Sequence, residues 1–188
     1  GTLDIYMTNQ AGCSYCDDNT YDNQAGCESN GWNDGTGVWM FDANMDDIAC
    51  TAVNGAYFNG EVGGWSFQLF GATIDGASGG SAEDNGFTIN AQAATYNAET
   101  DTQLPNILAF SLTGATISPG EGVLLSVSFS AFEGESICFG EDTGSAGANA
   151  IANANGGYIG TTWGDCFQVD DCAYDVCGVC DGPGAIYE

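Results

Sequence analysis

The chain lacks lysine, arginine and histidine entirely, although it contains 26 aspartate and glutamate residues and has a formal net charge of −26. Nucleic acids and anionic membrane surfaces are bound through cationic side chains, so both classes of partner are excluded. A histidine base, a lysine nucleophile, an arginine clamp and a zinc site with imidazole ligands are excluded as well. Paired carboxylates alone can hydrolyse glycosides, but such enzymes usually surround the sugar with cationic residues. We therefore predict that the chain is not an enzyme.

The missing cations also leave the acidic side chains without internal salt bridges, apart from one to the terminal amine. Self-repulsion at this charge must be offset by burial, disulfides, salt or bound cations. Hard cations that take oxygen ligands, chiefly Ca²⁺, are the natural counter-charge. Long apolar runs are missing too, so the sequence predicts no transmembrane segment.

Cysteine, in contrast, is abundant. Nine cysteines in a chain with 29 glycines indicate an oxidising, extracellular compartment, either secreted or at the cell surface. Because nine is an odd number, at least one sulfur is free, pairs between chains or has a partner beyond residue 188. The cysteines are Cys13, Cys16, Cys27, Cys50, Cys138, Cys166, Cys172, Cys177 and Cys180.

Alternating apolar and polar residues predict β-strands at 2–8, where Leu3, Ile5 and Met7 share one face, and at 65–69 and 123–129. The apolar run 107–112 predicts a strand that is buried on both faces. Glycine-rich turns separate these segments, and no long segment has helical periodicity. Shorter strands are expected at 87–89, 137–139 and 167–169, and a surface loop or close-packed contact at 144–157. The pattern predicts an all-β sandwich or jelly roll.

Two segments depart from this pattern. Residues 10–62 are rich in Cys, Asn, Asp, Gly and aromatic residues, and we interpret them as a disulfide-rich insertion with one short strand at 38–41. Residues 170–188 form an irregular Asp/Cys-rich tail, or the start of a further repeat, and are too few to bury a core. The sandwich domain, insertion included, is expected to span residues 1–169.

The run GGWSFQLFGATIDGASGGSAEDNGFTIN, followed by ILAFSLTGATISPGEGVLLSVSFSAFEGESICF, resembles cohesin-like sandwich modules of large secreted surface proteins of marine bacteria. The tail DDCAYDVCGVCDGPGAIYE resembles the Asp/Cys-rich repeats that follow such modules. The resemblance implies a cohesin-like jelly roll, a disulfide between Cys138 and Cys166, and non-catalytic assembly or adhesion, which is a fold-level analogy. The insertion at 10–62 departs from the family pattern.

Two groups of oxygen-bearing side chains are calcium candidates. Asp42, Asn44 and Asp46 have the i, i+2, i+4 spacing of an oxygen-ligand loop, but Asp47 and Val53 stand where an EF-hand has Gly and Glu. A solvated acidic loop is the alternative there. The second group lies among the last cysteines and consists of Asp165, Asp170, Asp171, Asp175 and Asp181.

The four cysteines of the insertion have two interpretations. Cys13 and Cys16, together with Cys27 and Cys50, have the spacing of a four-thiolate zinc site. Secretion favours the other interpretation, in which the four pair among themselves as disulfides.

The sequence therefore predicts a structural or adhesive module that self-associates into a homo-oligomer, filament, surface layer or matrix. The first strand and the tail are the segments expected to link copies. The alternative function is a carbohydrate-binding module that takes a polysaccharide on exposed aromatic side chains. The candidates for such a platform are Trp32, Trp39, Trp65 and Trp163.

Overall fold

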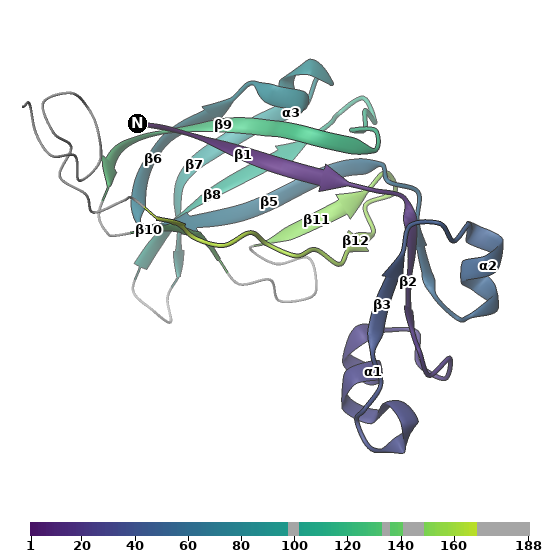
Figure 1. Cartoon of the computed structure of the whole chain (residues 1–188). Coiled ribbons are helices and arrows are strands. Elements are labelled where there is room, and N and C mark those ends of the chain that lie inside the picture. Colours follow the sequence, from purple (N-terminus) through teal and green to yellow (C-terminus); the bar gives the residue numbers. More distant parts are fainter. Residues whose placement is uncertain (98–101, 133–135, 141–148, 169–188) are drawn as a thin grey trace, which may run out of the picture.

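The computed structural model describes residues 1–97, 102–132, 136–140 and 149–168, and most of its regular structure is β-strand. The expected β-rich architecture is confirmed, with two sheets packed face to face and a third, smaller sheet beside them (Figure 1). The described residues also contain three short α-helices that the sequence pattern did not predict. None of the helices in the described part of the chain has the length and apolar character needed to cross a bilayer.

The first sheet has the antiparallel order β1-β9-β6. Its strands alternate between a core-facing and a solvent-facing row, as the sequence predicts, and Ile5 pairs with Leu125 on the core-facing row. A bulge interrupts the β1–β9 ladder between Ile5 and Tyr6. The bounds are β1 Thr2–Asn9, β6 Ala72–Ser78 and β9 Gly120–Phe132.

The second sheet is built around β5, which pairs with β8 on one side and with β10 and β11 on the other. The strands β7, β13 and β12 extend it by pairing with β8, β10 and β11, respectively. The bounds are β5 Val62–Phe70, β7 Thr88–Asn97, β8 Thr102–Phe110, β10 Ser136–Phe139, β11 Ala150–Asn153, β12 Tyr158–Ile159 and β13 Phe167–Gln168.

A single apolar cluster fills the space between these two sheets. The alternating residues Trp65, Phe67 and Leu69 of β5 are buried, and they meet Leu125 and Val127 of β9. Burying large side chains of this kind contributes about 1.5–3 kcal/mol each. The sandwich is therefore held together mainly by its core.

One expectation for the sandwich strands is wrong. The run 107–112 is not buried on both faces, because Leu108 is 40% exposed and the strand ends at Phe110. Leu112, beyond the strand, is 86% exposed. Of the two interpretations of 144–157, the described part favours the close-packed contact over the surface loop, because it begins at the buried Asn149 and contains β11.

The segment after β6 also differs from the expected turn. Residues Gly80–Asp84 form the helix α3. The carboxylate of Glu83 accepts a hydrogen bond from the backbone N–H of Gly79, 2.8 Å away. This contact satisfies a donor at the start of the helix, in the manner of a capping box.

Residues 10–61, which we call the arm, leave the sandwich after β1 and return at β5. The strand expected at 38–41 is present as β3, but it is one of three, because the arm has a three-stranded sheet of order β3-β2-β4. Asn23 and Asp46 cap its helices by accepting from the N–H groups of Gly26 and Ala49. The bounds are β2 Gly12–Cys16, α1 Gln24–Asn30, η1 Gly31–Asn33, β3 Trp39–Asp42, α2 Asp47–Ala52 and β4 Ala56–Phe58.

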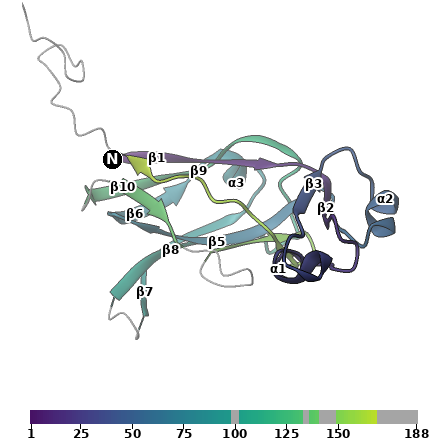
Figure 2. The ribbon, with the colours of Figure 1, turned by 60° about the horizontal axis from the view of Figure 1, so that its bottom comes forward.

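The arm projects from one end of the sandwich (Figure 1). In a second view, the N-terminus and β10, which pairs with β13, lie at the opposite end (Figure 2). The described part of the molecule is therefore elongated and has two different ends.

Candidate functional site: the junction of the arm and the sandwich

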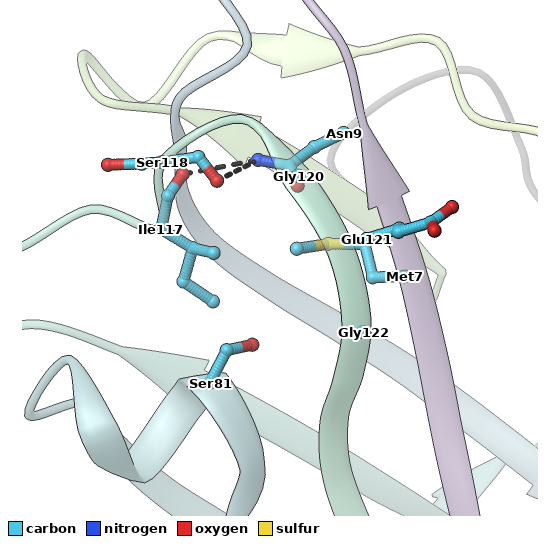
Figure 3. A pocket seen from close by; sticks show the side chains of 8 residues that line it. All are labelled: Met7, Asn9, Ser81, Ile117, Ser118, Gly120, Glu121 and Gly122. Carbon is cyan, nitrogen blue, oxygen red and sulfur yellow. Dashed lines mark hydrogen bonds between the residues drawn. The ribbon is translucent and has the colours of Figure 1, made fainter.

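The arm is fastened to the sandwich by the side chain of Asn9, the last residue of β1. Its amide nitrogen donates to the carbonyl oxygens of Gly60, Ile117 and Ser118, at 2.6, 3.2 and 2.9 Å. Figure 3 shows the contacts to Ile117 and Ser118. Asn9 is only 6% exposed, so these hydrogen bonds lie away from solvent. We call this arrangement the clasp, because it joins the point where the chain leaves the sandwich to the point where it returns.

Gly60 completes the clasp by bringing its carbonyl within reach of Asn9. Its φ angle is +87°, in the region that favours glycine. A Cβ atom at this position would also meet the ring of Pro119. Only glycine fits both conditions, so the return of the chain from the arm depends on this residue.

Two small cavities flank the junction. The first has a volume of about 110 Å³ and lies between β1, β9 and α3 (Figure 3). The second has a volume of about 140 Å³ and lies between the arm and the turn that joins β11 to β12. Pockets for drug-sized ligands usually have about 300–1,000 Å³, so each cavity is suited only to a small group. The first is lined by Met7, Asn9, Ser81, Ile117, Ser118, Gly120, Glu121 and Gly122, and the second by Tyr57, Phe58, Asn59, Asn153, Ala154 and Asn155.

The four cysteines of the arm form two buried disulfides. Cys13 of β2 is joined to Cys50 of α2, and Cys16 of β2 is joined to Cys27 of α1. The zinc interpretation is wrong, because paired sulfurs offer no thiolate ligands.

In the sandwich, Cys138 of β10 is joined to Cys166, which is the pair that the resemblance implies. This bond ties the segment before β13 to the second sheet. The remaining cysteines, Cys172, Cys177 and Cys180, lie outside the described residues.

The calcium candidates of the arm have local structural roles. An oxygen of Asp42 accepts from the backbone N–H of Asn44 at 2.8 Å and from its side-chain amide at 3.3 Å. An oxygen of Asp46 caps α2. Among the described residues, only one group of three cysteine or acidic side chains has its potential ligand atoms within 4.8 Å of one another. This group consists of Cys16, Asp17 and Cys27. The sulfurs of Cys16 and Cys27 form a disulfide, so this group leaves only the Asp17 carboxylate as a ligand. Calcium binding by the chain therefore stays a prediction.

The calcium candidates near the end of the chain are not brought together within the described residues. Asp165 is exposed on the segment before β13. The other four candidates, Asp170, Asp171, Asp175 and Asp181, lie outside the described ranges.

Two aspartates fasten the outer loop of the arm to the end of β2. Asp17 accepts from the backbone N–H of Val38 at 2.8 Å, and this bond, followed by the contact with the Trp32 indole, lowers the pKa of Asp17. The Thr20 hydroxyl and the backbone N–H groups of Trp32 and Thr20 lower the pKa of Asp18. Both carboxylates therefore stay ionised at pH values below the ordinary pKa range of aspartate.

The four tryptophans proposed as a sugar platform do not form one surface. Trp65 is buried in the core, where it contacts Phe87. Trp163 packs on Phe67, with ring centroids 6.1 Å apart. Only Trp32, which is 55% exposed and has a φ of +56°, presents a large area to solvent. The prediction that the tryptophans form one sugar-binding platform is therefore wrong.

Sequence reasoning missed the clasp and a second buried amide, that of Asn149. This side chain donates to the carbonyl of Gly140 at 2.9 Å and accepts from the N–H of Gln68 at 3.0 Å, so it fills the gap on the edge of β5 between β10 and β11. A signal for Asn9 was present. It occupies the next position in the buried alternation after Leu3, Ile5 and Met7, where an apolar residue is the ordinary choice.

The chain matches no protein-family model, no curated protein and no solved structure.

Proposed function

We propose that the protein is a non-catalytic, extracellular structural or adhesive module that assembles end to end with copies of itself. The observation that carries this proposal is the elongated shape with two different ends, one formed by the arm and the other by the N-terminus and β10 (Figure 2). A contact between unlike ends repeats from copy to copy, and it gives an open filament when it does not close into a ring.

The arm provides apolar surface for such a contact. Exposed apolar patches mark interaction sites more often than single exposed residues do. Five of the eleven exposed large hydrophobic side chains of the described residues belong to the arm, which supplies about a third of those residues. They are Trp32, Val38, Phe41, Ile48 and Tyr57.

Charge sets the conditions for this assembly. Each copy has a formal charge of −26, so the ends of two copies repel each other as they approach. At ionic strengths of 0.1–0.15 M, salt screens this repulsion with a Debye length of about 8–10 Å. Ca²⁺, which binds carboxylate oxygens, is the counter-ion that we propose for the junction. The resemblance to cohesin-like modules supports the same conclusion, since those modules act by binding rather than by catalysis.

The test is the molar mass by light scattering at increasing protein concentration, with Ca²⁺ or with a chelator at constant ionic strength. We expect oligomers that grow with concentration and are favoured by Ca²⁺. A stable interface buries more than about 1,000 Å². Filaments joined by interfaces of this size should also be visible by electron microscopy.

Matched variants locate the contact. Trp32→Ser with Phe41→Ser removes two exposed rings of the arm and should prevent growth, whereas Leu112→Ser, on an exposed side chain of the sandwich, should leave it unchanged. Removal of residues 170–188 tests whether the tail takes part. A protein that stays monomeric under every condition would refute the proposal, and so would growth that is equal in both sets of variants.

A further inference from the structure

The second cavity of the junction has a lining that differs from the rest of this acidic surface. It lies between the end of β4 in the arm and the turn that joins β11 to β12 in the sandwich. None of its six lining residues is charged, three of them are asparagines, and two are aromatic. Glu61, two residues beyond Asn59, has its backbone N–H and its carboxylate engaged by the Asn59 side chain.

The sandwich side of the cavity is shaped by Asn153. Its side-chain oxygen accepts from the backbone N–H groups of Asn155 and Gly157, both at 2.9 Å. Its backbone N–H donates to the carbonyl of Gly157, which closes the turn. These hydrogen bonds hold Ala154 and Asn155 at the cavity.

Hydrogen-bonding capacity remains at the cavity after the turn is built. Within the described ranges, the amide of Asn155, the amide nitrogen of Asn153 and the hydroxyl of Tyr57 have no hydrogen-bond partner. A carboxamide has N–H donors and a carbonyl acceptor, and a hydroxyl group can likewise donate and accept a hydrogen bond. The two groups are therefore complementary. The lining therefore suits a ligand that carries several hydroxyls.

The arm side of the cavity adds apolar surface. Tyr57 is 39% exposed, and Phe58 is half buried because it also packs against the sandwich core. Aromatic rings present a large rigid face at little cost in conformational entropy. An aromatic face beside free amides is complementary to a ring that has apolar C–H groups on its face and hydroxyls at its edge.

The net charge of the protein and the volume of the cavity restrict the class of ligand further. A surface with a formal charge of −26 and no cationic side chain repels anions, and the uncharged lining offers a cation no carboxylate. A volume of about 140 Å³ takes roughly one sugar-sized ring. We propose that this cavity binds one residue of a neutral polysaccharide. This site shares Tyr57 with the apolar surface of the arm, whereas Asn153 and Asn155 belong to the cavity alone. None of its residues is a tryptophan of the sequence-based platform.

The test uses affinity electrophoresis in native gels that contain a soluble β-glucan, a xylan or a galactomannan, with alginate as the acidic counterpart. Because the chain is strongly anionic, it migrates fast, and retardation by an immobile polysaccharide is easily measured. We expect retardation by at least one neutral polysaccharide and none by alginate. Tyr57→Ala and Asn155→Ala should each weaken this retardation about tenfold, the range expected when a hydrogen-bonding or stacking partner is lost.

The matched controls are Tyr6→Ala, on the exposed face of β1, and Asn19→Ala, on an exposed arm residue outside the lining, and both should bind as the unmodified chain does. Circular dichroism and melting curves establish that each variant is folded. No retardation by any neutral polysaccharide overturns the proposal. Retardation that survives both cavity substitutions, or that is stronger with alginate, also overturns it. Light scattering of the same variants keeps this result separate from assembly, since Asn155→Ala should leave oligomer growth unchanged.

Discussion

The arm and the sandwich are both β-sheet structures, but different forces hold them together. In the sandwich, a continuous apolar cluster between two sheets includes Trp65, Phe67 and Leu125. The fully buried side chains of the arm are its four cysteines, and none of its residues belongs to the buried core cluster. Disulfides, the hydrogen bonds that Asp17 and Asp18 accept and the hydrogen bonds that Asn9 donates therefore replace a core in the arm.

This difference follows from size. A segment of about fifty residues cannot bury enough apolar surface to offset its conformational entropy, and small extracellular units usually need disulfides for this reason. The sandwich is large enough to rely on burial. The comparison predicts that the two regions can be destabilised separately, and the substitutions below test this in decreasing order of expected effect.

The largest effect should come from replacing all four arm cysteines with serine. The chain-entropy estimate is about 4 kcal/mol for Cys13–Cys50, which spans 37 residues, and about 3 kcal/mol for Cys16–Cys27, which spans 11. We expect the arm to unfold while the sandwich stays folded. Hydrogen exchange of the two regions, together with chymotrypsin cleavage near Trp32 and Phe41, measures this. Unchanged protection of the arm would contradict it.

A smaller effect, confined to the sandwich, should follow from Leu125→Ala. Leu125 is fully buried between the sheets, and removing a buried leucine side chain usually costs about 2–5 kcal/mol. Denaturant unfolding should shift to lower midpoint, whereas the arm disulfides keep their local structure. The control is Leu112→Ala, for which a surface change of less than about 0.5 kcal/mol is expected. Equal costs at the two leucines would show that the core does not have the role described.

The clasp should have an intermediate effect on the connection between the two regions. Asn9→Ala leaves the carbonyls of Gly60 and Ser118 without the Asn9 donor, at a cost of about 1–3 kcal/mol. It should loosen the arm without unfolding either region. Asn9→Asp should cost more, because a carboxylate would face three carbonyl oxygens. Thermal unfolding and hydrogen exchange near Gly60 measure both. The same substitutions at the exposed Asn19 serve as controls, and the expectation fails if they have comparable effects.

The smallest effect should be a pH-dependent loosening of the loop that contains Trp32. The pKa of Asp18 is lower in the folded chain than in the unfolded one, so folding favours its ionised form. This stabilisation is fully present above the ordinary aspartate pKa of about 4 and is lost as the pH falls through the lower folded value. Trp32 fluorescence or NMR should therefore change below about pH 4.

The variant Asp18→Asn should show this loosening already at neutral pH. Its acid transition below pH 4 should be smaller, because only Asp17, which contacts the Trp32 indole, then titrates beside Trp32. A Trp32 signal with the same acid transition in the variant and in the unmodified chain would assign the loosening to other carboxylates.

Patterns within single segments determined much of the architecture. The alternation at 2–8, 65–69 and 123–129 specified strands and their buried faces, because successive side chains of a strand point to opposite sides. The density of cysteine and the lack of cationic residues likewise indicated disulfides and excluded whole classes of chemistry.

Partners that are distant in the sequence were decided only by the tertiary structure. The run 107–112 is apolar throughout, but what lies on each face depends on the neighbouring strands, and Leu108 faces outward. The two cysteine pairs of the arm, Cys13–Cys50 and Cys16–Cys27, depend on which helix packs on which side of β2. Asn9 has its role because Gly60 and Ile117 come within hydrogen-bonding distance across more than fifty residues. Composition and periodicity report on local geometry, whereas the junction and its cavities arise from contacts between segments that only the folded chain brings together.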